Sequence, residues 1–305
     1  MAGVGTTTTT ASALRQYWHD FFLENLYAAF TLKGLTKKTT VGKGQGKVVW
    51  WYGITKVSPA GAALSEGADP AATSSAARRV SGTLAEYGKL VKNSRLLMDT
   101  AIQGTREQIM KDLAMDAGKL LNDTVLGKAL GGTNVVYAGG KVIRSDVVEA
   151  NTATIDEVRK CVRLLKLSSA EPFEDGYFVA LVHPDVAYDL MSDSKWLDIS
   201  KYRDSVKYDI PGEVGRLYGV RFVEDPTIQV LLNSGSANTD IYRTPIFGKN
   251  FIGQSEMGGL EIVINEPGRN SELRQFNTYG FRFVMATEIL HNARGVRLES
   301  NATLA

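Results

Sequence analysis

The chain has 305 residues, of which 44% are hydrophobic and 22% charged, and its net charge at neutral pH is +2. This composition is typical of a folded protein with a sizeable core, and the near balance of charge does not indicate strong electrostatic capture of nucleic acid or acidic membranes. Cys161 is the only cysteine, which excludes disulfide frameworks and multi-cysteine zinc sites and indicates a buried thiol in a reducing compartment. The N-terminus lacks the pattern of a secretory signal, and no stretch approaches about 18 apolar residues, so we expect a cytoplasmic protein without a membrane span.

The first predicted element is a helix within SALRQYWHDFFLENLYAAF, which follows a run of threonines. Its apolar residues, among them Trp18, Phe21 and Phe22, recur at helical spacing and form one broad aromatic face. Two interpretations of this face stay open, a helix docked on its own domain and an arm that grips a neighbouring molecule. A helix lying on a membrane surface is disfavoured, because the polar face is not rich in lysine.

A basic, glycine-rich stretch follows, KGLTKKTTVGKGQGK, and it fails the test for a phosphate-binding loop. Such a loop needs glycine five residues before its Gly-Lys pair and Ser or Thr after the lysine, where Val41 and Val48 stand here. The segment after it has the pattern of a strand, whereas a phosphate loop leads into a helix N-terminus. We therefore predict a flexible, positively charged linker.

Two β-rich segments, KVVWWYGITKV and RRVSGTLAEYGKLV, predict the legs of a long hairpin. In the first leg, Trp50 lies on one face and Trp51 on the other, so both faces need cover. The tip between the legs, SPAGAALSEGADPAATSSAA at residues 58–77, consists mainly of small residues and contains two prolines that discourage strand pairing. It cannot offset its own ordering cost of about 1 to 2 kcal/mol per residue for the backbone, so we expect a partner to order it.

Capping-box patterns mark the start of two helices. The first has Thr105 followed by Gln108, ends before Gly131, and at 1.5 Å per residue would span about 35 Å, enough for a strut across a domain. The second has Thr154 followed by Glu157.

The C-terminal half contains further strands and one more helix. YFVALVHP predicts a buried strand, after which Pro184 takes the first helical position and an aspartate caps the corner. Strands follow in GEVGRLYGVRFVEDP, LEIVINEP and FNTYGFRFVMATEIL, the last with Tyr279, Phe281, Phe283 and Met285 in alternation. The order of elements is mixed α+β, without a βαβ repeat.

No pattern in the sequence points to catalysis or to a metal. His19, His183 and His291 are far apart, without HxH or HExxH pairing, and there is no GxSxG motif. The carboxylates are scattered over predicted helix faces, where they usually face solvent. The sequence thus predicts no catalytic, cofactor-binding or metal-binding residues, and we do not expect an enzyme.

The order of elements resembles that of the major capsid (coat) protein of tailed bacteriophages, the Hong Kong 97-like fold, and within that group the family found in N4-like podoviruses. The likeness is carried by KGQGKVVWWY, LSEG, AEYGKLVKNSRLLMD, NDTVLGKALGGTNVVYAGG, YFVALVHPDVAYDL, GEVGRLYGVRFVEDP and IVINEPG. Their order and spacing, over almost the whole chain to about Arg297, make the match. One departure follows the Pro-Gly turn, where such proteins often carry a DPL-like triplet and this chain has Ser271, Glu272 and Leu273.

The resemblance implies an α+β Hong Kong 97-like capsid fold in four parts. These are an N-terminal arm (1–46), an extended hairpin loop (47–92), a peripheral domain with the long strut helix (93–154 and 241–305) and an axial domain (155–240). It also implies that the hairpin tip lies across the peripheral domain of the neighbouring subunit.

The function implied by the resemblance is that of a structural protein that self-assembles into the icosahedral shell around a phage double-stranded DNA genome. Expected partners are further copies in hexamers and pentamers, scaffolding, portal and decoration proteins, and packaged DNA contacted without sequence specificity, with no membrane and no cofactor. The protein would be located in the virion capsid after assembly in the host cytoplasm. The alternatives are an encapsulin-like bacterial nanocompartment shell, which shares the fold, and more distantly an enzyme with a lid loop.

Residues of the arm and the hairpin are expected at the subunit interfaces. They are Trp18, Phe21, Phe22, Trp50, Trp51, Pro59, Leu64, Glu66, Arg78 and Arg79. Glu66, the carboxylate of LSEG, is expected to form an ion pair with a basic residue of the neighbour.

Overall fold

The computed structural model describes residues 19–26, 31–32, 34–54, 77–100, 105–196, 212–265 and 275–304. Its strands are β1 (Lys37–Val41), β2 (Val48–Ile54), β3 (Ala77–Thr83), β4 (Ala85–Ser94), β5 (Val135–Tyr137), β6 (Phe178–Val182), β7 (Glu213–Leu217), β8 (Val220–Glu224), β9 (Tyr242–Phe247), β10 (Ile252–Asn265), β11 (Phe276–Ile289) and β12 (Gly295–Ser300). Its helices are α2 (Arg95–Thr100), α3 (Thr105–Ala129), α4 (Ile155–Leu167) and α5 (Pro184–Ser192), with short 3₁₀ turns η1 (Ala138–Gly140), η2 (Arg144–Asp146), η3 (Ser236–Asn238) and η4 (Asn292–Arg294). A further helix covers residues 19–26. The mixed α+β class expected from the sequence is confirmed.

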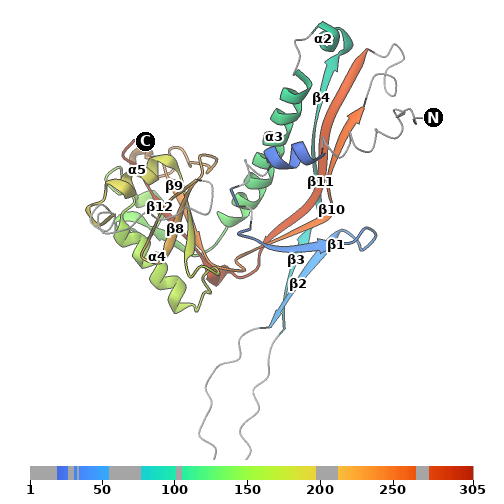
Figure 1. Cartoon of the computed structure of the whole chain (residues 1–305). Helices are drawn as coiled ribbons and strands as arrows, with labels where there is room; N and C mark the ends of the chain where they lie inside the picture. The colour runs from blue at the N-terminus through green and yellow to red at the C-terminus, as the bar shows by residue number, and fades with distance from the viewer. Residues whose placement is uncertain are drawn as a thin grey trace, which may run out of the picture.

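An elongated unit is built on a four-stranded sheet in the order β1-β10-β11-β4. Figure 1 shows α3 running along this sheet, with the helix of residues 19–26 against it. The predicted alternation in β11 is confirmed, because Tyr279, Phe281, Phe283 and Met285 are all buried and contribute to one core together with the buried face of α3. At 25 residues, α3 spans about 37 Å, close to the length expected for the strut.

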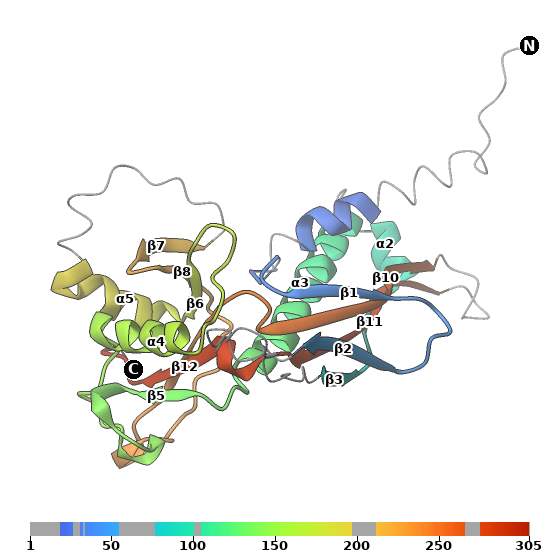
Figure 2. The ribbon, with the colours of Figure 1, turned by 90° about the horizontal axis from the view of Figure 1, so that it is seen from below.

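A second, more compact unit contains the six-stranded sheet β5-β12-β9-β6-β8-β7. In the view from below, α4 and α5 lie along one face of this sheet (Figure 2), where residues such as Val158, Leu165 and Leu190 form its core. Strands β5, β9 and β12 come from the ranges that we assigned to the peripheral domain, so the six-stranded sheet draws strands from both sides of those boundaries. Boundaries drawn at residues 154 and 241 miss this, because strand pairing joins segments that are distant in sequence.

Strand β6 separates two cores, as expected for the buried strand of YFVALVHP. All five of its residues are buried. Phe178, Ala180 and Val182 face the core beneath α4, whereas Val179 and Leu181 join the core of the elongated unit. The two units therefore share apolar packing as well as chain connections.

The basic stretch before the hairpin differs from the flexible linker that we expected. Residues Lys37–Val41 form β1, an edge strand parallel to β10, with Lys37 opposite Gly253 and Val41 opposite Met257. A strand of lysine and threonine at a sheet edge is consistent with its position, since lysine discourages pairing with further chains. The sequence shows no apolar alternation here, so the segment itself does not predict a strand. It becomes a strand because it pairs with β10.

The two helix-start details expected near α4 and α5 are also corrected. Thr154 is the N-cap of α4 but its side chain makes no capping hydrogen bond, and Glu157 instead accepts a bond from the backbone N–H of Gly139 at 2.5 Å. At α5, Pro184 does take the first turn, but the cap is His183, whose Nδ1 accepts from the N–H of Asp185 at 3.3 Å. Near α4, Glu157 is thus bound by η1, a neighbouring segment of the fold.

Candidate subunit interfaces

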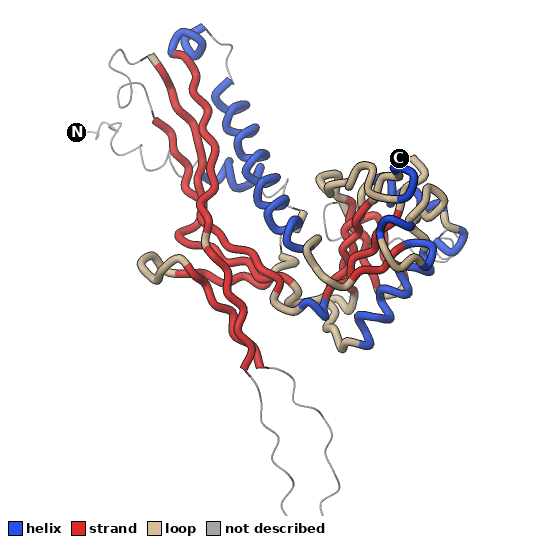
Figure 3. Tube along the Cα trace, turned by 180° about the vertical axis from the view of Figure 1, so that it is seen from behind, coloured by secondary structure: helices blue, strands red, loops and turns tan. Residues whose placement is uncertain are grey.

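The predicted hairpin is confirmed for the pair β2–β3, whose two faces differ sharply in burial. The rest of the expected second leg is corrected, because Ala85–Ser94 forms β4 and pairs with β11 in the four-stranded sheet. β2 pairs with β3 in antiparallel register, from Val48 opposite Thr83 to Ile54 opposite Ala77. Seen from behind, the hairpin extends away from the six-stranded unit (Figure 3). Its inner face buries Val49 and Trp51, while Val48, Trp50 and Tyr52 of the outer face remain 43%, 41% and 70% exposed. One face thus belongs to the monomer, and the other is free for a contact outside it.

Trp51 anchors the hairpin to the four-stranded sheet. It packs in a small core with Leu84 and Leu290, and its indole N–H donates to Thr39 Oγ1 at 3.2 Å. Two glycines leave room for the ring, because a Cβ added at Gly82 would lie 2.7 Å from Trp51 and one added at Gly253 would lie 3.0 Å from it. The position of Trp51 therefore depends on the absence of side chains at both glycines.

Two arginines of β3 make contacts at the hairpin, one on its exposed face and one at its base. The guanidinium of Arg79 lies 4.0 Å from the centre of the Trp50 ring, a cation–π distance. Arg78 Nη1 lies 3.1 Å from His291 Nδ1, and because arginine can only donate, the imidazole nitrogen is the acceptor. Burial, with the nearby cations Arg294, Arg78 and Lys37, lowers the pKa of His291.

The helix of residues 19–26 docks on its own chain, which was one of the two interpretations left open. Phe22 is fully buried, with its ring centre 6.0 Å from that of Phe281, and Leu26 is buried in the same core. Phe21 is only partly buried and lies at the edge of this core. Phe22 and Trp51 thus contact their own chain, whereas Phe21 and Trp50 keep surface available to a neighbour.

Sequence reasoning missed a buried polar junction between the two units. Asn122, in the buried stripe of α3, donates to Asp225 Oδ2 at 2.7 Å and to Thr227 Oγ1 at 3.1 Å, and its oxygen accepts from the N–H of Leu32 at 3.3 Å. Asp225 follows β8 and accepts two more bonds from Thr227. Burial raises the pKa of the adjacent Asp123. The available signal was an asparagine at a position where helical spacing calls for an apolar residue.

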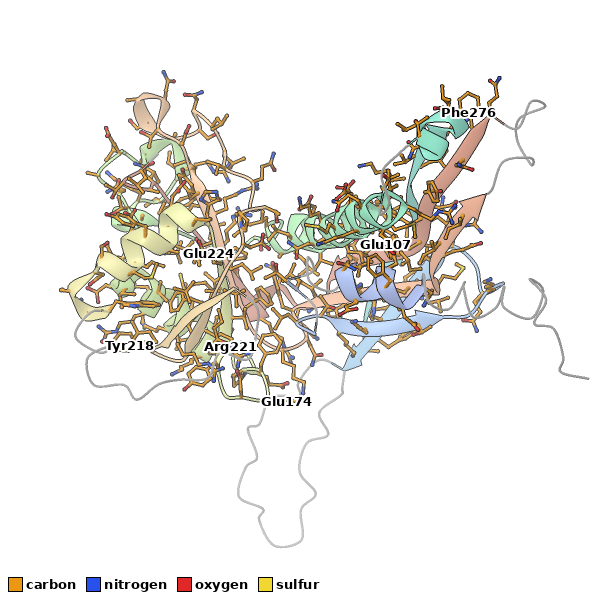
Figure 4. All side chains as sticks on the ribbon, turned by 45° about the horizontal axis from the view of Figure 1, so that its top comes forward. Glu107, Glu174, Tyr218, Arg221, Glu224 and Phe276 are labelled. Atoms are coloured by element: carbon orange, nitrogen blue, oxygen red, sulfur yellow. The ribbon has the colours of Figure 1, made fainter. Side chains whose placement is uncertain are left out.

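Exposed apolar side chains also gather at two other extremities. At the far end of the four-stranded sheet, Leu96 and Leu97 of α2 and Phe276 at the start of β11 are about half exposed or more. Figure 4 shows Phe276 at this end, beside α2. On the six-stranded unit, Val142 and Leu232 are exposed on segments that pack together around η2 and η3. Three ends of the molecule thus present apolar surface.

The described residues hold no arrangement that indicates catalysis. Burial raises the pKa of the Cys161 thiol to about 12, which makes it unreactive, as the sequence indicated for a buried thiol. Tyr242 donates to Asp185 at 2.9 Å and its pKa is raised to about 12 by burial, so with His183 it forms a helix-start cluster. Within these residues no group of three metal-ligating side chains occurs, and no helix is long and apolar enough to cross a membrane.

A cavity of about 550 Å³ lies between the two units, and four of its charged residues form ion pairs within the chain. Arg221 pairs with Asp175, and Lys249 pairs with Glu174 at 3.0 Å. Glu174 and Arg221 lie at the same edge of the six-stranded unit in Figure 4.

The remaining expected interface residues, Trp18, Pro59, Leu64 and Glu66, lie outside the described residues, as does most of the 58–77 tip.

Comparison with known proteins places the fold. No family model and no curated protein matches the chain by sequence. Among solved structures, the capsid of Ralstonia phage GP4 matches with a TM-score of 0.73 at 11% identity, over 91% of this chain and 90% of that chain. The cyanophage Pam1 capsid asymmetric unit matches with a TM-score of 0.69 at 16% identity, over 92% of both chains. The head structure of Helicobacter pylori bacteriophage KHP40 matches with a TM-score of 0.65 at 11% identity, over 90% of this chain and 91% of that chain. The chain therefore has the fold of phage capsid proteins along nearly its whole length.

Proposed function

We propose that this chain is the major capsid protein of a tailed bacteriophage, which assembles into the icosahedral shell around the double-stranded DNA genome. The observation that carries the proposal is the exposed outer face of the β2–β3 hairpin, formed by Val48, Trp50 and Tyr52, on a chain with the capsid fold. Exposed apolar surface at an extended element is typical of a protein interaction site. The neighbouring solved structures are shells, which supports a structural role rather than an enzymatic one.

The hairpin is the proposed contact with the adjacent subunit of a hexamer or pentamer. Trp50, with Arg79 stacked on its ring, offers a rigid aromatic anchor next to a cation, a combination that is enriched at the centres of interfaces. The tip residues 58–77, including Pro59, Leu64 and Glu66, would continue this contact across the elongated unit of the neighbour. In this arrangement the elongated unit corresponds to the peripheral domain and the six-stranded unit to the axial domain.

The other extremities would supply further contacts in the same shell. Leu96, Leu97 and Phe276 end the elongated unit, and Val142 and Leu232 lie on the six-stranded unit, so each subunit can engage several neighbours at once. Several modest contacts per subunit make assembly cooperative, because each contact raises the effective concentration for the next. Scaffolding, portal and decoration proteins and non-specific contact with packaged DNA belong to this proposal, as does assembly in the host cytoplasm.

The test compares two neighbouring tryptophans whose roles should separate. The full chain is purified, with and without its scaffold, and imaged by negative-stain microscopy, where closed shells or hexamer and pentamer rings are expected. Trp50→Ala should impair assembly while changing the free energy of unfolding of the free subunit by less than about 1 kcal/mol. Trp51→Ala should destabilise the free subunit by about 3 kcal/mol, in the range for truncating a buried aromatic residue.

Two outcomes would contradict the proposal. A chain that stays monomeric at high concentration with scaffold present would contradict the proposal that it forms a shell. Unimpaired assembly of Trp50→Ala would contradict the proposed contact through the hairpin. The control variant Tyr218→Ser changes an equally exposed aromatic residue on the β7–β8 turn, away from the hairpin, and should still assemble. Shells isolated from cells that contain protein cargo in place of DNA would favour the nanocompartment alternative.

A further inference from the structure

Two arginines bind a single carboxylate on the six-stranded sheet, and a third lies beside it. Glu299 of β12 is fully buried, and Arg144 of η2 binds it through Nε at 2.6 Å and Nη2 at 2.7 Å. Arg297, two residues earlier on β12, places its Nε 2.8 Å from the same carboxylate. Arg243 of β9 is the direct register partner of Glu299. Since side chains alternate along a strand, this cluster lies on the face opposite Leu298, which packs beneath α4.

The cluster carries more positive charge than it balances. Three guanidinium groups and one carboxylate give three positive charges and one negative charge, so two positive charges remain. Arg243 bonds only neutral acceptors within the described residues, the backbone carbonyl of Gln229 at 3.2 Å and its side-chain oxygen at 3.1 Å. Burial and repulsion from Arg297 and Arg144 lower the pKa of Arg243, against the attraction of Glu299. Partly buried cations without a counter-charge are unfavourable, and a bound anion would relieve this.

Each arginine also keeps one terminal nitrogen without an acceptor among the described residues. Arg144 uses Nε and Nη2 on Glu299, Arg243 uses Nε and Nη2 on Gln229, and Arg297 uses Nη1 on the carbonyl of Leu130. This leaves Nη1 of Arg144, Nη1 of Arg243 and Nη2 of Arg297 as donors. The planar guanidinium fork matches the oxygens of a phosphoryl group, and several forks suit its multiple acceptors.

We propose that Arg144, Arg243 and Arg297 form a binding site for a phosphoryl oxyanion, with Glu299 as the buried carboxylate that holds two of the three guanidinium groups in place. The ligand chemistry is shared by two sources, free inorganic phosphate and the phosphate of a nucleic-acid backbone. The site goes beyond the proposed shell function, since it requires neither the hairpin nor subunit contacts.

The first experiment measures binding of inorganic phosphate to the full, unassembled chain by isothermal titration calorimetry and thermal unfolding, with sodium chloride at matched ionic strength. Phosphate should raise the melting temperature of the wild type above that in chloride. Arg243→Gln should weaken phosphate binding at least tenfold. The control Arg282→Gln removes one positive charge from an exposed arginine already paired with Glu261 and Glu86, and should stay within twofold of the wild type.

The second experiment distinguishes the sources with a short duplex DNA oligonucleotide, followed by fluorescence anisotropy at fixed salt. If Arg243→Gln loses both phosphate and oligonucleotide binding, the ligand of the site is the phosphate of a nucleic-acid backbone. If the variant loses phosphate binding alone, the ligand is free inorganic phosphate. Equal melting temperatures in phosphate and chloride, or unchanged phosphate binding in Arg243→Gln, would each overturn the site. If Arg243→Gln does not fold, Arg243→Lys, which keeps the charge and loses the fork, should weaken phosphate binding at least threefold, and unchanged binding overturns the site equally.

Discussion

The junction between the two units and the β2–β3 hairpin use their side chains in opposite ways. At the junction, Val179 and Leu181 enter the shared core, and the polar group Asn122 is bonded on both its nitrogen and its oxygen. On the hairpin, Trp51 is buried while its neighbour Trp50 is 41% exposed. The difference indicates that the junction stabilises the single chain, whereas the outer face of the hairpin stays uncovered by that chain. Under the proposed function, this outer face contacts a neighbouring subunit.

The largest effect is expected from breaking the junction. Asn122→Ala removes the donor to the buried carboxylate of Asp225 and the acceptor for the N–H of Leu32, so both groups lose a partner away from water. We expect a loss of about 3 kcal/mol in the free energy of unfolding, measured by urea denaturation of unassembled subunits.

The matched control for that variant lies on the same helix. Gln108→Ala removes an exposed bond to Asp112, so the expected change is within about 0.5 kcal/mol. Equal effects of the two substitutions would show that the junction is not a special source of stability.

A second substitution sharpens the role of the inner hairpin face. A Cβ at Gly82 would approach the Trp51 ring to 2.7 Å, so Gly82→Ala must displace the ring or the strand, at a cost of about 1 to 3 kcal/mol. Gly53→Ala, on the partner strand, meets only the far end of His291 at 3.9 Å and should be neutral or slightly stabilising. Urea denaturation compares both, and a tolerated Gly82→Ala would mean that Trp51 is not tightly seated.

These two regions also show what the sequence could and could not predict. Periodicity predicted α3, the pairing of β2 with β3 and the buried face of β11, because the apolar pattern of each segment reports its own burial. It did not predict that Ala85–Ser94 leaves the hairpin to pair with β11. It could not decide which face of β2 is covered, since Trp50 and Trp51 are equally apolar and the difference arises from β11 and the loop after it. Asn122 and the cluster of Arg144, Arg243 and Arg297 depend on partners far away in the chain, so no local pattern marks them.

A smaller effect, dependent on pH, is expected where α4 meets η1. Burial raises the pKa of Glu157, whose Oε1 accepts from the N–H of Gly139 while Oε2 has no partner among the described residues. The folded state therefore binds this proton more tightly than the unfolded state does. Protonation of Glu157 therefore stabilises the folded state. This stabilisation is fully present below the ordinary pKa of 4.5 and is lost as the pH rises through the pKa that Glu157 has in the folded state.

Glu157→Gln keeps an acceptor for Gly139 and removes the titration. Urea denaturation across this pH range should show that the free energy of unfolding of Glu157→Gln increases relative to that of the wild type as the pH rises to 7. Glu157→Ala, which also removes the acceptor, should be less stable than Glu157→Gln at every pH. A difference between Glu157→Gln and the wild type that stays constant with pH would assign no role to the buried charge.

The smallest effect of the series is expected at the base of the hairpin, where His291 accepts from Arg78 at 3.1 Å. Burial first, then Arg294, Arg78 and Lys37, lower the pKa of this imidazole below its ordinary 6.5, with Glu171 acting in the opposite direction. The unfolded chain therefore binds the proton more readily. The stability that neutral His291 contributes is fully present above about pH 6.5 and is lost as the pH falls through the pKa that His291 has in the folded state. The reason is that a protonated ring can no longer accept the bond from Arg78 and lies near three cations.

His291→Gln removes this titration, so its unfolding free energy should fall less than that of the wild type between pH 7.5 and pH 5.5. Hydrogen exchange places the loss within the molecule, since β2 and β3 should lose protection in the wild type at pH 5.5 while β6, buried between the two cores, should not. Equal loss of protection in all three strands would mean that acid acts on the whole fold. The hairpin would then respond to pH like the junction, and the contrast between the two regions would be limited to their surfaces.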